Sequence, residues 1–139
     1  MDRELLKTYA TASGGDVEAY AWLLAWHGWC HELDDDVDDP ARDRLNVVDR
    51  GAEAAVLFAA PFWRRHSEAL GPMVGVIAAK YRSSVLAERD GRQRLSDALR
   101  IAGNDMVLAV AYLRGGTDLA RRVAESLWPI VERDQLSAA

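Results

Sequence analysis

A dense run of carboxylates, with two histidines just upstream, is the part of this sequence best equipped for chemistry. Six of the eight residues from Glu32 to Asp39 are acidic, and His27 and His31 precede them. Carboxylates this close together repel one another unless cations neutralise them or water screens them. The run therefore predicts either a divalent-metal site or a solvated helix end.

Helical periodicity places part of this run on one inward face. Residues three or four positions apart share a face of an α-helix. Spacings of 4, 3 and 4 connect His27, His31, Asp34 and Asp38, which continue a stripe that begins with apolar residues. A face that starts in the core and ends in histidine and aspartate predicts a polar pocket within a helical bundle.

The other residues of this helix are expected to face elsewhere. Asp35 lies at the border of the inward face, and we expect solvent around Glu32, Asp36 and Asp39. A separate apolar stripe is expected to pack on the core. Its members are Trp22, Trp26, Trp29, Leu33 and Val37.

The position of the acids on their helix favours the metal interpretation. The helix dipole disfavours carboxylates at a C-terminus, and a divalent cation would relieve both this penalty and their mutual repulsion. We expect Asp34, Asp35 and Asp38 to hold Mg²⁺ or Mn²⁺, which carboxylates prefer. As direct ligands, His27 and His31 would favour Zn²⁺, Fe or Mn. Otherwise they would serve as a general base or as orienting groups.

A second polar face is predicted later in the chain. Tyr81, Ser84 and Glu88 are spaced to share one side of a helix. We expect Glu88 to add a carboxylate to the metal site, and Tyr81 and Ser84 to donate hydrogen bonds to a ligand. Lys80 and Arg82 are the candidate cations for a phosphate group. The alternative is a core tyrosine surrounded by ordinary surface charges.

A third group comes directly before the most apolar run of the chain, Met106 to Leu113. Asn104 and Asp105 open this segment, and buried polar side chains need partners. We expect both to face a polar cavity or a metal ion; a hydrogen bond between helices is the alternative. Asp97 and Arg100 share a face with Asn104 and would extend the site.

Apolar residues recur at helical spacing and strand-like alternation is absent, so we predict an all-α fold. The expected architecture is a single-domain bundle of about five to six helices over residues 1–139. Asp16 is a predicted N-cap, Asp39-Pro40 and Gly115-Gly116 are predicted ends, and Gly103 is a predicted bend. The six expected helices are 2–11, 16–38, 42–60, 72–89, 92–114 and 117–133, and a shorter segment is expected at 61–70.

Composition limits the class of protein. Half of the 139 residues are apolar, and the net charge of −5 argues against nucleic-acid binding. A single cysteine, Cys30, suits a reducing cytoplasm. No apolar run is long enough for a membrane span. We therefore expect a soluble cytoplasmic protein. Two of its five tryptophans, Trp63 and Trp128, lie outside the acidic helix and favour a homo-oligomer, unless they fill the monomer core.

The acidic run resembles the Asp-Asp-x-x-Asp motif of isoprenyl diphosphate synthases and terpene cyclases, which Asp34, Asp35 and Asp38 satisfy. That resemblance implies an all-α fold in which Mg²⁺ holds a substrate diphosphate. Asn104-Asp105 is similar to the start of the family's second metal motif. Leu108 and Tyr112 occupy the Ser/Thr and Glu positions of that motif, so it is incomplete here.

A second resemblance is to the all-α nucleoside triphosphate pyrophosphohydrolases, the MazG and dimeric dUTPase group. Glu32 and Asp35 match one of the acidic pairs that hold Mg²⁺ in that group. Both resemblances imply a metal-dependent enzyme that acts on a diphosphate-containing small molecule. A helical metal-binding or interaction protein without catalysis is the third interpretation.

Overall fold

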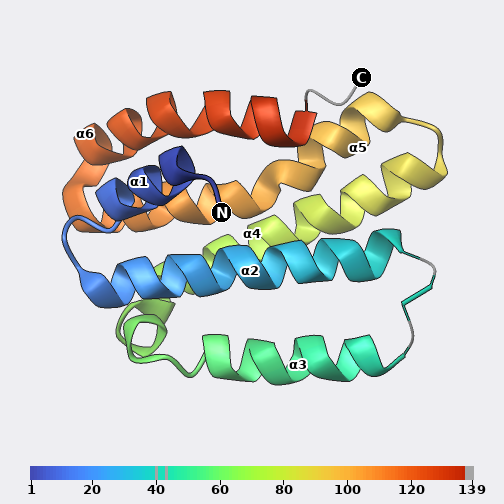
Figure 1. Ribbon diagram of the computed structural model, residues 1–139, viewed down its shortest axis with the longest axis horizontal. Coiled ribbons are helices and arrows are strands. Elements are labelled where there is room, and N and C mark those ends of the chain that lie inside the picture. Colours follow the sequence, from blue (N-terminus) through green and yellow to red (C-terminus); the bar gives the residue numbers. More distant parts are fainter. Residues whose placement is uncertain (40, 43, 137–139) are drawn as a thin grey trace.

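The computed structural model describes residues 1–39, 41–42 and 44–136, and these form an all-α bundle, which confirms the predicted fold class (Figure 1). Short turns of other helical types join α5 to α6, at η1 (Ile101–Asn104), and follow α6, at η2 (Glu132–Leu136). The α-helices are α1 (Arg3–Ala12), α2 (Val17–Asp38), α3 (Leu45–Leu57), α4 (Pro61–Arg89), α5 (Gln93–Arg100) and α6 (Asp105–Val131).

Helix α2 carries the whole acidic run to its C-terminal end. Asp16 is its N-cap, as predicted, because its Oδ1 accepts hydrogen bonds from the backbone amides of Glu18 at 2.9 Å and Ala19 at 3.2 Å. The helix ends at Asp38, and Asp39 is the C-cap. Pro40, the predicted helix stop, lies outside the described residues. The N-cap thus fixes where α2 begins, and the buried Trp22, Leu23 and Trp26 mark the side that faces the bundle.

Helix α4 corrects the prediction of two segments that meet at Pro72. It runs unbroken from Pro61 to Arg89 with Pro72 inside it. A proline within a helix removes one backbone hydrogen bond and is locally unfavourable. Burial on both sides of it outweighs this cost, because Leu70 and Ile77 both lie in the core. The continuous helix aligns Tyr81, Ser84 and Glu88 with that core.

The predicted helix end at Gly115-Gly116 is confirmed, but the single helix expected over 92–114 is wrong, because the chain breaks near the predicted bend at Gly103. Gly103 lies in η1, which separates α5 from α6. Gly116 has φ of 69° and ψ of −161°, so α6 consists of two helical arms joined by a non-helical glycine pair. Figure 1 shows the chain reversing direction there. The reversal lets both arms contribute to one core.

The core lies between α1, α2, α4 and both arms of α6. Met106, Val107 and Val110 are fully buried, as the apolar run predicted. Trp22 and Trp26 are also buried, but Val37, expected on the same core stripe, is 44% exposed because α2 extends beyond the core at its acidic end. Among the described residues, no helix is long and apolar enough to cross a membrane.

Helix α3 lies on the outside of the bundle, alongside α2 (Figure 1). Two tryptophan side chains of α2 hold α3 in place by hydrogen bonds to backbone carbonyls of α3. Trp22 donates to the carbonyl of Leu57 at 2.9 Å, and Trp29 donates to the carbonyl of Arg50 at 3.0 Å. The tryptophan stripe therefore positions α3 beside the acidic end of α2 as well as filling the core.

Candidate functional site

The inward acids of α2 converge on one guanidinium, that of Arg100 at the end of α5. Arg100 Nη1 lies 2.8 Å from Asp38 Oδ1 and 3.3 Å from Asp34 Oδ1, and Nη2 lies 2.7 Å from Glu88 Oε2 of α4. The arginine side chain is only 14% exposed. The structure thus brings together three of the predicted metal-ligating carboxylates, and an arginine lies between them.

Two residues of α4 orient this group. Tyr81 donates its hydroxyl hydrogen to Asp34 Oδ1 at 2.7 Å, and the Arg100 guanidinium lies 5.1 Å from the centre of the Tyr81 ring. The buried Ser84 accepts a hydrogen bond from Arg100 Nε at 2.9 Å and donates one to the carbonyl of Tyr81. Ser84 therefore positions Arg100, whereas the sequence predicted that it would contact a ligand.

The charges of this group reinforce one another. Burial raises the pKa of Tyr81, and the hydrogen bond to Asp34 raises it further, so the phenol stays protonated at all ordinary pH values. Burial lowers the pKa of Arg100, but the hydrogen bond to Asp38, the charge of Asp38 and the hydrogen bond to Glu88 more than offset this, so the net shift is upward. The guanidinium is a permanent cation here.

A second arginine group covers the opposite face of the acidic run. Arg42 lies 3.2 Å from Asp36 and 3.4 Å from Glu32, and 3.7 to 3.9 Å from Asp35 and Asp39. Arg50 of α3 lies 2.9 Å from Asp36. The expectation that Asp36 meets only water is wrong, because α3 covers it and leaves its side chain 11% exposed.

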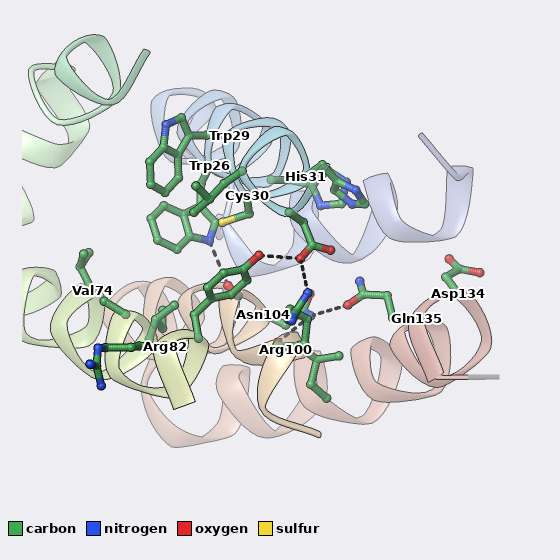
Figure 2. Close-up of a pocket in the computed structure, with 18 of the residues that line it drawn as sticks. Trp26, Trp29, Cys30, His31, Val74, Arg82, Arg100, Asn104, Asp134 and Gln135 are labelled. Atoms are coloured by element: carbon green, nitrogen blue, oxygen red, sulfur yellow. Dashed lines mark hydrogen bonds and ion pairs between the residues drawn. The ribbon is translucent and has the colours of Figure 1, made fainter. Parts of the chain in front are cut away.

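A cavity of about 540 Å³ opens beside Arg100 between α2, α4 and the α5–α6 junction (Figure 2). Its apolar wall includes Trp26, Val74 and Ile77. Its polar wall contains several predicted site residues: His27, His31, Asp34, Tyr81, Arg82, Arg100 and Asn104. His27, His31 and Asp34 of the inward stripe thus line a pocket with an apolar side and a charged side, whereas Asp38 and Glu88 contact Arg100 outside the cavity lining.

His27 lies deeper in this wall than His31. Its Nδ1 is 3.0 Å from the hydroxyl of the buried Tyr9, and the rings of His27 and His31 are 4.3 Å apart between centroids. Burial lowers the pKa of His27 to about 4, and repulsion by His31 contributes. The ring is neutral near pH 7, so it offers hydrogen bonds rather than positive charge and is a weak general base.

Cys30 lines the same wall of the cavity. Burial raises the pKa of its thiol to about 12, and the neighbouring Asp34 contributes to the shift. The side chain is therefore a neutral thiol and not a nucleophilic thiolate.

The sequence predicts that Asn104 and Asp105 face the same site, but in the structure their side chains have different surroundings. Asn104 lines the cavity, and its Nδ2 donates to the carbonyl of Ile101 at 2.9 Å and to Gln135 Oε1 at 3.4 Å. Asp105 does not line the cavity and pairs with Lys80 at 2.7 Å. Consecutive residues of a helix point about 100° apart, so Asn104 at the end of η1 and Asp105 at the start of α6 have different surroundings.

The two candidate phosphate cations also differ in position. Lys80 is held by its ion pair with Asp105, outside the cavity lining. Arg82 belongs to the lining, although Figure 2 shows it directed away from Arg100. Arg100 is thus the cation that the structure places closest to the inward acids.

Four contributors escaped the sequence reasoning: Tyr9, Arg42, Arg50 and Gln135. Each comes from a segment without a motif. Tyr9, Arg50 and Gln135 reach the acidic helix or the cavity through packing of their elements, whereas Arg42 lies in the segment directly after α2. Tyr9 illustrates the difficulty, since a tyrosine in an amphipathic helix is typical of a core. Its hydroxyl contact with His27 depends on how α1 crosses α2.

No family model, curated protein or solved structure matches this chain. Neither resemblance drawn from the short motifs is therefore tested by a relative. Within the described ranges, no group of three or more His, Cys, Asp or Glu side chains is arranged to hold a metal ion directly. The inward acids are instead arranged around Arg100.

Proposed function

We propose that the cavity binds a small phosphorylated molecule together with a divalent cation, Mg²⁺ or Mn²⁺, and that the chain is an enzyme acting on a diphosphate. The observation that carries this proposal is the convergence of Asp34, Asp38 and Glu88, from two helices, on one cation at the cavity edge. The three carboxylates already form a site for positive charge.

The charge balance of this group fits a further cation. Three carboxylates around one guanidinium leave two negative charges, and each of the three acids keeps an exposed side-chain fraction of 40% to 49%. Carboxylate oxygens are the ligands that Mg²⁺ and Mn²⁺ prefer. Asp34, Asp38 and Glu88 would hold the metal once Arg100 releases them.

Arg100 would then be available to the anion. A guanidinium presents paired donors that match a phosphate, and this geometry makes arginine a strong phosphate ligand. Movement of a single side chain would therefore exchange the internal ion pairs for a metal on the acids and a phosphate on the arginine. The metal, when bound, neutralises charge on the diphosphate and can activate water.

The rest of the cavity would receive the organic part of the ligand. Trp26, Val74 and Ile77 offer an apolar wall that excludes water from the reacting end. Neutral His27 and the amide of Asn104 would orient the ligand by hydrogen bonds. In this scheme His27 positions the ligand and does not serve as a strong base.

The nucleotide pyrophosphohydrolase alternative receives less support from the geometry. Its acidic pair, Glu32 and Asp35, lies on the Arg42 side of α2 and does not line the cavity. The Asp34 and Asp38 pair faces Arg100, and Asp34 lines the cavity. Diphosphate chemistry on the Arg100 side is therefore the function proposed.

A calorimetric titration with Mn²⁺, with and without pyrophosphate, tests the site. Wild-type protein should bind Mn²⁺, more tightly when pyrophosphate is present, and the double variant Asp34→Asn with Asp38→Asn should lose at least about tenfold in affinity. Asp35→Asn is the matched control, because Asp35 is 61% exposed and faces Arg42.

Three results would discriminate between the interpretations. Equal Mn²⁺ affinity in wild type and the double variant would exclude this site, provided that circular dichroism shows both to be helical. Metal binding without release of phosphate or pyrophosphate from a panel of prenyl diphosphates and nucleoside triphosphates would indicate a non-catalytic metal-binding protein. Turnover of the triphosphates alone would indicate the pyrophosphohydrolase.

A further inference from the structure

Helix α1 contributes Tyr9 to the wall of the cavity, where it meets His27 of α2. The tyrosine is 2% exposed, and its hydroxyl oxygen lies 3.0 Å from Nδ1 of His27. The two rings meet edge to face, with centroids 5.7 Å apart. The contact therefore links a buried phenol to a histidine that lines the cavity.

The direction of this hydrogen bond follows from the chemistry of the two groups. A neutral imidazole carries one hydrogen on two nitrogens, whereas a phenol can both donate and accept. Burial lowers the pKa of His27 to about 4, so its ring carries a single hydrogen near pH 7. A phenol, with an ordinary pKa of about 10, is a better donor than a neutral imidazole, and the bare imidazole nitrogen is the stronger base. Tyr9 therefore donates, and Nδ1 of His27 accepts.

The balance of hydrogen-bond partners supports the same direction. In the ranges that the structure describes, His27 is the one hydrogen-bond partner of the Tyr9 hydroxyl. If His27 donated from Nδ1, the phenolic hydrogen would have no acceptor at a buried position, which is unfavourable. With Tyr9 as the donor, the ring hydrogen lies on Nε2 of His27, a partly exposed residue of the cavity wall.

We propose that Tyr9 is a positioning residue, which fixes His27 in the tautomer with hydrogen on Nε2 and so makes this part of the cavity wall a hydrogen-bond donor. The other tautomer would present a bare nitrogen and would accept instead. The rings of His27 and His31 have centroids 4.3 Å apart, but no hydrogen bond joins them among the described side chains. The N–H group is thus available to a ligand.

The position of His27 indicates which part of a ligand it would contact. His27 and Asp34 are about two helical turns apart, roughly 10 Å along α2. A phosphate bound by Arg100, which contacts Asp34 at 3.3 Å, would lie at the Asp34 end of the stripe. The N–H group of His27 would therefore meet a hydroxyl or carbonyl oxygen on the organic part of the ligand. This statement rests on the proposed function, whereas the tautomer of His27 does not.

Nitrogen NMR of the free full chain tests the tautomer. Two-bond correlations from the ring carbon hydrogens distinguish a protonated nitrogen from a bare one, and the signals lost in His27→Gln belong to His27. In wild type near pH 7, Nε2 should carry the hydrogen and Nδ1 should be bare. In Tyr9→Phe, the two nitrogen resonances should move toward each other, because both tautomers become populated.

Tyr112→Phe is the matched control, because Tyr112 is 61% exposed and should leave the His27 signals unchanged. Hydrogen on Nδ1 in the wild-type protein would overturn the proposal without any variant. Unchanged resonances in a Tyr9→Phe protein that circular dichroism shows to be helical would overturn it as well, because the tautomer would then not depend on Tyr9.

Two matched probes test the consequence for a ligand. An alkyl diphosphate and its ω-hydroxyalkyl counterpart, each with a chain that spans roughly 10 Å, differ only in the terminal oxygen. With Mg²⁺ present, wild type should bind the hydroxylated probe roughly fivefold more tightly, as expected for one neutral hydrogen bond, and Tyr9→Phe should lose most of this preference.

Equal affinity of wild type for the two probes would exclude the contact between His27 and a ligand oxygen. Failure of both probes to bind would overturn the proposed function together with that contact. The NMR result for the free protein is independent of both outcomes, so it decides separately whether Tyr9 fixes the tautomer of His27.

Discussion

At the candidate site, one positively charged side chain, Arg100, contacts three carboxylates. It lies within 3.3 Å of carboxylate oxygens from Asp34, Asp38 and Glu88, and Ser84 accepts its Nε hydrogen. Because those acids sit near a helix C-terminus, they need a cation more than surface acids do. The guanidinium therefore stabilises these acids and would compete with any metal for the same oxygens.

This competition gives a prediction for Arg100→Gln. The variant should lose about 1–2 kcal/mol of unfolding free energy without metal, a value discounted for solvent screening of the partly exposed acids. Its Mn²⁺ affinity should rise, because the competing cation is gone, and pyrophosphate should no longer tighten Mn²⁺ binding. Thermal denaturation and calorimetric titration measure both effects.

Arg42→Gln is the control for that experiment. It removes the same charge from the same helix end, but on the face away from the cavity. Its coupling between Mn²⁺ and pyrophosphate should match wild type. If Arg42→Gln and Arg100→Gln changed metal binding equally, net charge rather than the Arg100 site would be responsible.

His27 supplies a prediction about pH. Burial lowers its pKa from 6.5 to about 4, so between these values the unfolded chain binds a proton that the folded chain does not. Stability should therefore fall as pH decreases from 6.5 to about 4, by roughly 2 kcal/mol after a discount for partial exposure of the ring.

Urea unfolding at pH 7 and pH 4.5 measures this contribution. His27→Gln keeps a group that can hydrogen-bond to the Tyr9 hydroxyl but does not titrate. Its stability should depend less on pH than that of wild type, by the amount assigned to His27. Identical pH dependence in the two proteins would mean that His27 is not the titrating group.

At the scale of elements, the reversal at Gly115-Gly116 decides how α6 is used. A single straight helix of this length would carry its second half out of the bundle, whereas the reversal returns Leu119 and Val123 to the core. Gly116 adopts a combination of φ and ψ that residues with a Cβ rarely adopt. The backbone freedom of glycine is therefore a structural requirement at this position.

Two glycine substitutions should act in opposite directions. Gly116→Ala should destabilise the protein by about 1–3 kcal/mol, because alanine is strained in that conformation. Gly75→Ala, inside α4 with nothing within 4 Å of an added Cβ, should stabilise it by up to about 1 kcal/mol. Denaturant unfolding checks both values. Similar effects of the two changes would contradict the role assigned to the reversal.

At the scale of the whole molecule, arginines from other segments pair with both sides of the acidic end of α2. Its inward side receives Arg100 from α5, and its outward side receives Arg42 and Arg50. Helix α3 packs against α2 through Arg50, beside Asp36, and through the buried Leu57. The candidate site and the position of α3 are thus both arranged around the acidic helix α2.

The sequence alone determined the helices and much of their orientation. Asp16 as a cap, the glycine pair as a stop and the burial of Met106 follow from local chemistry and periodicity, which act over a few residues. The division of the acids into an inward and an outward set also followed from spacing, because helical angles do not depend on neighbours.

Only the tertiary structure decided which cations meet those acids. Arg100 is 62 residues from Asp38 along the chain, and no local pattern encodes a contact that depends on how α5 packs against α2. The same holds for Asp36, which α3 covers, and for Asp105, which Lys80 holds outside the cavity. Packing also kept α4 continuous through Pro72, because core burial on both sides outweighs a local penalty.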